Sequence, residues 1–127
     1  MNFATMLLNN GMFKDQQILS KKTIDLMTSN HLAGNKDLIS SSHADTASET
    51  TLAGVGFGLG FQILINPAKN QINSSIGEYG WGGAASTTFW IDPSENLITI
   101  FLTQLIPSTT YNIRRELRTL VYSSLTY

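Results

Sequence analysis

The sequence has no cysteine and little charge, and these two absences restrict the classes of protein to which it can belong. Without cysteine the chain has neither a disulfide framework nor a thiolate metal site. Charged residues make up 13% of the chain, about half of the roughly 25% that is usual in globular domains. A net charge of −1 gives no electrostatic basis for binding nucleic acid or an anionic membrane surface.

Long apolar runs are absent as well. No stretch approaches the roughly 18 apolar residues of a membrane-spanning helix, and the first residues lack the pattern of a signal peptide. The two histidines, His31 and His43, are twelve positions apart and show no spacing typical of metal ligands, so we expect no metal and no cofactor.

The length of 127 residues predicts a single domain. Residues 1–32 are expected to form a pair of helices. The first ends at Gly11, and the second covers about 21–29 with Ser20 as its N-cap. Residues 33–53 are rich in Gly, Asn, Ser and Thr and predict a long loop.

Residues 54–104 have strand character. Alternation over 57–65 predicts one strand, and a turn at 66–70 lets 72–81 return antiparallel to it. The next strand is 87–92. Residues 97–104 are almost continuously apolar, as expected for a central strand covered on both faces.

Residues 108–127 predict a terminal helix that begins after a cap at Ser108 or Thr109. Its apolar stripe contains Ile113, Leu117, Leu120, Val121 and Leu125, whereas Arg114, Arg115, Glu116 and Arg118 are expected to face water. The predicted fold class is therefore α+β, an antiparallel sheet backed by a C-terminal helix, with two helices at the N-terminus.

The most unusual stretch is 79–93, where Tyr79 and Trp81 flank a glycine and the pair Gly82–Gly83 follows. Glycine pairs inside a strand pattern either allow a ligand to approach the backbone closely or mark a kink or bulge. Tyr79 lies two residues before Trp81, on the same face of a strand, and could contact a ligand or pack within the sheet.

This stretch resembles the C-terminal portion of serine β-lactamase-like hydrolases, the group of class C β-lactamases, DD-peptidases and β-lactamase-fold esterases. Trp81-Gly82-Gly83 resembles the third motif of that family, on the strand beside the active site. Residues 88–93 and 97–104 resemble the next two strands with their turn. Residues 6–11 and 19–28 resemble the helix pair that comes before the glycine-rich strand.

The family's catalytic motifs are not found. No serine has a lysine three positions later, and the second motif, Tyr-x-Asn or Tyr-x-Ser, is interpreted as absent too. In the family both motifs lie N-terminal to the matched region. The resemblance therefore implies that the nucleophile belongs to a missing N-terminal part of the same domain, and we expect no turnover by this chain alone.

The resemblance also implies roles for the residues that remain. Trp81, Gly82, Gly83 and Ala84 would line a substrate site for a β-lactam, peptide or ester, with the Ala84 N–H in an oxyanion hole. Trp81 stands where many relatives have Lys or His. Because an indole carries no positive charge, a neutral substrate is favoured. An extracytoplasmic location is likewise implied only by the resemblance.

Two further expectations concern an alternative function and the association of the chain with itself. The alternative function is a non-catalytic binding or self-association module. In either case a sheet of only these strands has an unpaired edge, and unpaired edges are templates for association. We therefore expect a homodimer through that edge.

Overall fold

The computed structural model describes residues 1–41 and 52–126. In chain order its helices and strands are α1 (Asn2–Leu8), β1 (Met12–Phe13), β2 (Gln16–Gln17), α2 (Lys21–Met27), the 3-10 helix η1 (Ala33–Asn35), α3 (Leu38–Ser41), β3 (Val55–Phe57), β4 (Gln62–Leu64), α4 (Pro67–Asn70), β5 (Tyr79–Gly82), β6 (Thr88–Asp92), β7 (Leu97–Phe101) and α5 (Ile113–Ser123). None of the helices in these ranges is both long and apolar enough to cross a bilayer.

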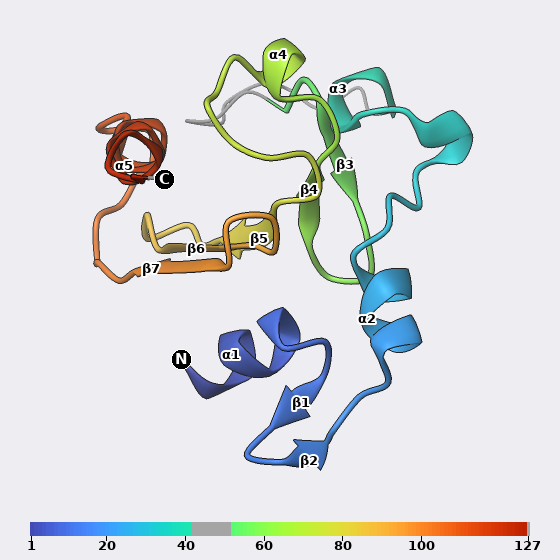
Figure 1. Cartoon of the computed structure of the whole chain (residues 1–127). Helices are drawn as coiled ribbons and strands as arrows, with labels where there is room; N and C mark the ends of the chain where they lie inside the picture. The colour runs from blue at the N-terminus through green and yellow to red at the C-terminus, as the bar shows by residue number, and fades with distance from the viewer. Residues whose placement is uncertain (42–51, 127) are drawn as a thin grey trace.

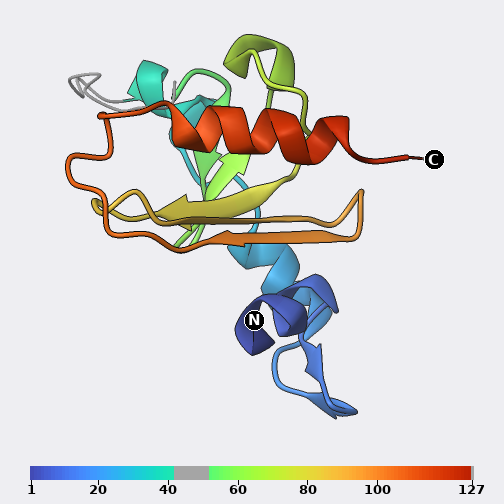
Figure 2. The ribbon, with the colours of Figure 1, turned by 90° about the vertical axis from the view of Figure 1, so that its left-hand side faces the viewer.

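The main sheet has five antiparallel strands in the order β3-β4-β5-β6-β7. Helix α5 lies along one face of the sheet, and α1 lies on the opposite side (Figures 1 and 2). A two-stranded hairpin, β1-β2, connects α1 to α2. The prediction of an α+β fold with an antiparallel sheet and a C-terminal helix is confirmed.

The N-terminal helices form as their sequence indicates. The Ser20 side chain accepts the Thr23 N–H at 3.1 Å, which caps the start of α2. After α1 the chain turns at Gly11, whose φ is 89°, and a Cβ at this position would lie 2.0 Å from the Leu19 carbonyl oxygen. Only glycine tolerates both the dihedral angle and the contact.

The segment 33–53, predicted as a loop, contains η1 and α3, and residues 42–51, with His43 among them, lie outside the described residues. Asp37 holds the described part in place. Its carboxylate accepts the Gly54 and Ser40 amides and pairs with Lys69 at 2.6 Å. The Gly54 amide, followed by Lys69, keeps the pKa of this carboxyl well below its usual range.

The single strand predicted over 57–65 is wrong, because the chain folds there into the hairpin β3–β4. Gly58 donates its N–H to the Phe61 carbonyl at 2.8 Å, and Gly60 has a φ of 97°. Apolar residues alternate through the turn as well, so the two-residue period of the sequence does not distinguish a hairpin from a single strand. The sheet consequently has five strands, whereas the sequence predicted four.

Strand β7 also differs from its prediction as a central strand covered on both faces. It is the last strand in the sheet order and ends at Phe101. Ile100 is 37% exposed and Leu102, just beyond the strand, is 79% exposed. The apolar run resembles a central strand because its side chains are apolar on both faces, yet within residues 1–41 and 52–126 no strand pairs with its outer edge.

Helix α5 begins after Asn112, not after Ser108 or Thr109, and its packed face is wider than predicted, because it includes arginines beside the half-buried Ile113, Leu117 and Val121. Arg118 is 7% exposed, whereas Leu120 of the apolar stripe is 69% exposed. The arginine-bearing face packs on the sheet because carbonyl oxygens and a buried carboxylate lie there. The prediction that Arg114, Arg115 and Arg118 are solvated is wrong.

The main apolar core lies between the sheet and the N-terminal helices. Its buried members come from α1, α2 and three strand segments, and they are Ala4, Met6, Leu7, Ile24, Phe61, Ile63, Tyr79 and Ile91. This core fixes the face of the sheet that continues toward Trp81.

Candidate functional site

Strand β5 presents two different faces, and the candidate site lies at its C-terminal end. In the sheet register Trp81 is opposite Phe89, and Phe89 is opposite Ile100. Because side chains alternate along a strand, this row faces the α1 side, while Gly80 and Gly82 face α5. The predicted common face of Tyr79 and Trp81 is thus observed.

The row of Trp81, Phe89 and Ile100 borders an open hollow of about 500 Å³. Its other lining comes from the start of α1, from the glycine pair and from the end of β7, namely Met1, Phe3, Ala4, Gly82, Gly83, Thr87, Thr88 and Leu102. The lining holds no charged side chain, and Trp81 is 46% exposed. The hollow is therefore suited to uncharged, apolar groups.

Steric contacts explain why both positions of the pair Gly82–Gly83 are glycine. A Cβ on Gly82 would lie 3.0 Å from the Arg114 guanidinium, and one on Gly83 would lie 2.5 Å from the Thr87 hydroxyl. These contacts come from within the molecule. The pair therefore makes room for the packing of the turn against Arg114 and Thr87.

A short turn follows the pair and returns the chain to β6. The Gly83 N–H donates to the Thr87 carbonyl at 2.9 Å, and the Ser86 N–H donates to the Gly83 carbonyl at 3.1 Å. The buried Ser86, with a φ of 67°, donates its hydroxyl to the Leu105 carbonyl at 2.7 Å. Ala84 is exposed at the tip, and within the described part of the chain its N–H makes no hydrogen bond.

Arg114 of α5 holds this turn from the opposite face of the sheet. One terminal nitrogen of its guanidinium donates to the carbonyl oxygens of Gly83 and of Thr87, the latter at 3.0 Å. Each of these two carbonyls also accepts a backbone N–H from within the turn. The guanidinium therefore fastens the base of the turn to the C-terminal helix.

A buried polar network lies further along the same interface. Arg118 pairs with Glu78 at 2.7 Å and its guanidinium lies 4.6 Å from the Trp90 ring centroid. The Tyr122 hydroxyl lies 2.7 Å from both Glu78 and Asp92. Burial, followed by the charge of Glu78, raises the pKa of Tyr122 far above its usual range. The Tyr122 hydroxyl thus links the carboxylates of Glu78 and Asp92.

The sequence did contain a signal for this interface. Arg114, Arg118 and Tyr122 are spaced by four residues, so they occupy one face of α5. The predicted apolar stripe covers a neighbouring part of the helix surface, so hydropathy alone does not indicate that the polar face is packed too. The spacing of four is the signal that groups the three residues.

Tyr79 is buried, with 2% exposure, and its ring packs edge-on against Phe61 at 5.3 Å. Burial raises the pKa of its hydroxyl to about 12. These surroundings favour the packing alternative for Tyr79, because an enclosed ring offers no surface to a ligand.

A Tyr-x-Ser triplet is in fact present, at Tyr122 and Ser124, so the interpretation that this motif is absent is wrong. In the structure the triplet lies at the end of α5. The Tyr122 hydroxyl is engaged with Glu78 and Asp92, and the Ser124 hydroxyl donates to the Val121 carbonyl at 2.7 Å. Neither hydroxyl lies in the hollow beside Trp81.

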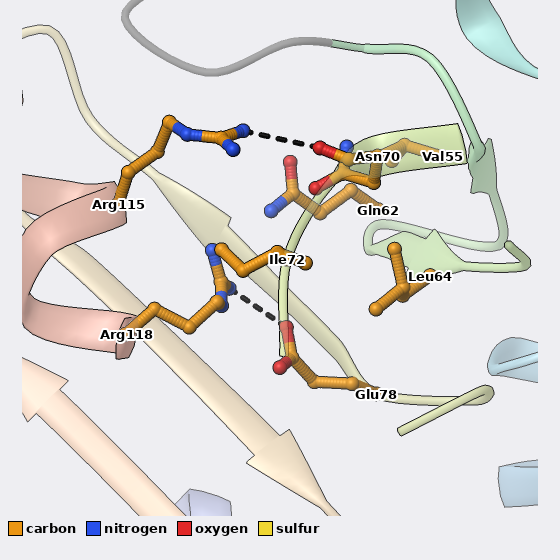
Figure 3. Close-up of a pocket in the computed structure, with 8 residues that line it drawn as sticks. All are labelled: Val55, Gln62, Leu64, Asn70, Ile72, Glu78, Arg115 and Arg118. Atoms are coloured by element: carbon orange, nitrogen blue, oxygen red, sulfur yellow. Dashed lines mark hydrogen bonds and ion pairs between the residues drawn. The ribbon is translucent and has the colours of Figure 1, made fainter. Parts of the chain in front are cut away.

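A second, small cavity lies between α5 and the sheet (Figure 3). Its volume is about 20 Å³, close to that of one water molecule. Arg115 and Arg118 border it from the helix side, while Gln62 and Glu78 border it from the sheet. It is too small for a substrate.

Comparison with known proteins gives relatives in sequence and in structure. No protein-family model matches the chain. The chain is 30% identical over 110 residues to "Uncharacterized protein MT1414" of Mycobacterium tuberculosis (strain CDC 1551 / Oshkosh) and to "Protein Rv1367c" of Mycobacterium tuberculosis (strain ATCC 25618 / H37Rv). These matches cover 84% of this chain and 26% of each relative, so the chain spans about a quarter of their length.

Two kinds of solved structure share the fold. One is "EstCE1, a hydrolase with promiscuous acyltransferase activity", with a TM-score of 0.69 and 22% identity over 94% of this chain and 27% of that chain. Another is the unliganded "Simvastatin Synthase (LovD) from Aspergillus terreus", with a TM-score of 0.71 and 22% identity over 95% of this chain and 32% of that chain. The chain therefore has the fold of a portion of these two enzymes, the β-lactamase fold that its sequence motifs predicted.

Proposed function

We propose that this chain forms one wall of the active site of a serine hydrolase that cleaves β-lactam, peptide or ester bonds through an acyl-enzyme. In this proposal the nucleophilic serine and its proton-transfer partners belong to a part of the domain that this chain does not contain. Trp81, Gly82 and Gly83 line the substrate site, and the Ala84 N–H donates to the developing oxyanion.

The arrangement of the turn after β5 is the observation that carries the proposal. The Gly83 amide is used within the turn, whereas the Ala84 amide lies at an exposed tip without a partner in the described residues. Ala84 itself does not line the hollow of about 500 Å³, but its neighbour Gly83 does. An unpaired N–H at the rim of a substrate-sized hollow is what an oxyanion site requires. The shared fold with an esterase and an acyltransferase supports the same chemistry.

The character of the hollow favours an uncharged substrate. Trp81 supplies an indole where a lysine would attract a carboxylate, and no charged side chain lines the hollow. We infer that esters and amides without a carboxylate beside the scissile bond are preferred over carboxylate-bearing β-lactams.

The alternative, a non-catalytic binding or self-association module, is favoured by a different observation. The large apolar side chains around the hollow are exposed, among them Phe3 at 57% and Leu102 at 79%. The sequence upstream of Met1 distinguishes the two functions. A Ser-x-x-Lys motif there supports the hydrolase, and an upstream domain without one supports the binding module.

The activity test uses the isolated chain and the longer protein side by side. The isolated chain should hydrolyse neither a chromogenic β-lactam nor a short-chain nitrophenyl ester, because it has no nucleophile. The longer protein should hydrolyse the ester, and replacement of the motif serine by alanine should abolish turnover. Saturable hydrolysis by the isolated chain would contradict the proposal.

The specificity test uses Trp81→Lys in the longer protein. This variant should raise kcat/KM for a carboxylate-bearing β-lactam relative to the ester by about tenfold, equivalent to about 1.4 kcal/mol. Leu120→Lys, on the exposed side of α5, is the matched control and should leave the ratio unchanged. An unchanged ratio in Trp81→Lys would remove Trp81 from the substrate site.

A further inference from the structure

Arg114 and Ala84 are connected through one peptide unit. The carbonyl of Gly83 and the N–H of Ala84 belong to the same planar group, and in a trans peptide they point in opposite directions. Whatever holds the Gly83 oxygen therefore also sets the direction of the Ala84 N–H. The structure places two donors on that oxygen, the Ser86 N–H at 3.1 Å and the Arg114 guanidinium.

From this geometry we propose that Arg114 is a positioning residue for the site, acting through the Gly83–Ala84 peptide. This inference rests on the proposed function, because it assigns Arg114 a role in presenting the oxyanion donor. The guanidinium fixes the plane of the peptide, so the Ala84 N–H points away from α5 and stays aimed outward. Arg114 itself is not among the residues that line the hollow.

Three further hydrogen bonds hold the turn in place. Arg114 also donates to the Thr87 carbonyl at 3.0 Å, so one guanidinium spans both sides of the turn. From the other end, Leu105 donates its N–H to the Ala85 carbonyl at 3.2 Å, and the Ser86 hydroxyl donates to the Leu105 carbonyl. The turn is held at its base and at its side, and the Ala84 and Ala85 amides at its tip make no hydrogen bond within the described residues.

The charge of Arg114 adds a second effect. A hydrogen bond from an ionised donor polarises the peptide that accepts it, and hydrogen bonds in a chain strengthen one another. The charge on the Gly83 oxygen therefore makes the Ala84 N–H a stronger donor. A lysine could supply the charge, but its ammonium lies on a flexible four-carbon chain, whereas the donating nitrogen of Arg114 is held in the plane of the guanidinium.

The experiment is a backbone relaxation measurement by NMR on the ¹⁵N-labelled 127-residue chain, and it requires no catalysis. In the wild type the Ala84 amide should have an order parameter of about 0.85, as in rigid backbone, and in Arg114→Ala it should fall below about 0.6. The Ala84 ¹⁵N resonance should move as the polarising bond is lost. Arg114→Lys should restore part of the shift and less of the order.

Arg115→Ala is the matched control, because Arg115 is the neighbour on α5 and donates to the carbonyls of Asn70 and Gln71 instead. It should leave Ala84 unchanged. Gly82→Ala provides a second route, since its methyl group would lie 3.0 Å from the guanidinium and push it by a few tenths of an ångström, which lengthens its hydrogen bonds without deleting the side chain. It should loosen Ala84 as well, and it decides the matter if Arg114→Ala does not fold.

Two results would overturn the inference: an Ala84 amide that stays ordered in both Arg114→Ala and Gly82→Ala, or an equal loss of order in Arg115→Ala. Failure of the proposed function would give a different experimental result. There the longer protein lacks hydrolysis while Arg114→Ala still releases the Ala84 amide.

Discussion

At the scale of single residues, three arginines of α5 have three different partners, and these partners explain why the arginines pack on the sheet and are not solvated. Arg114 binds the turn after β5, Arg115 binds the carbonyls at the end of α4, and Arg118 pairs with Glu78. A guanidinium presents five donors in a fixed plane, so it satisfies buried carbonyls and carboxylates that an apolar side chain would leave unpaired.

The buried pair of Arg118 and Glu78 should contribute far more to stability than a surface pair. We expect Glu78→Gln to lower the free energy of unfolding by about 3 kcal/mol or more, because it leaves a buried guanidinium without its counter-charge. Urea denaturation followed by circular dichroism measures this loss.

The matched control is Lys21→Gln, which breaks the exposed i,i+4 pair of Lys21 with Asp25. Its cost should stay below about 0.5 kcal/mol, since solvent screens such pairs. Similar losses in Glu78→Gln and Lys21→Gln would mean that the buried network does not hold α5 on the sheet.

At the scale of elements, β5 is the strand on which the site depends, and glycine at Gly80 allows it to pair closely with β6. A Cβ at Gly80 would lie 2.1 Å from the Phe89 carbonyl oxygen and 2.8 Å from the Trp90 Cα. Both atoms belong to backbone, so a side chain at this position has no flexible neighbour to displace. The predicted close approach around the glycines is therefore made by the protein's own strand at Gly80.

Gly80→Ala should therefore cost about 3 kcal/mol, the upper part of the range for overpacking, because the strands must separate. The loss is measurable in denaturant unfolding, and the Trp90 fluorescence should change with it. Ala84→Ser, at the exposed tip of the same turn, is the control and should change stability by less than about 0.5 kcal/mol. A mild effect of Gly80→Ala would contradict the packing described for β5 and β6.

At the scale of the whole molecule, the sheet ends in a strand whose outer edge has no partner in the described residues. Strand β7 is five residues long and contains neither proline nor charge, the features that usually protect an edge. The exposed Ile100 and Leu102 lie beside this edge. In the complete domain we expect the missing N-terminal strands to pair there.

Alone, the chain should associate through β7. We predict a dimer in sedimentation equilibrium at micromolar concentration, and we expect Ile100→Lys to shift it toward the monomer because like charges would meet across the edge. Leu120→Lys, on the exposed side of α5, should leave the association unchanged. A monomeric mass at high dilution with a single cooperative unfolding transition would contradict this prediction.

Much of the fold was predictable from local patterns. The Ser20 cap and the glycine after α1 determined the first helices. Strands β5, β6 and β7 were recognised from their residue types, and the order of motifs indicated the family. The hairpin β3–β4 was missed, because alternation continues through the turn at Gly58–Phe61 and carries no information about direction.

The sequence by itself determined the elements, the fold class and the candidate stretch after Tyr79, because these depend on neighbours along the chain. Only the tertiary structure decided which residues of α5 pack on the sheet, that Tyr79 is enclosed and that Arg114 donates a hydrogen bond to the Gly83 carbonyl. Those outcomes depend on groups that are distant in the chain, such as Gly83 and Arg114, which are 31 positions apart. A buried donor or acceptor must find a partner wherever the fold provides one.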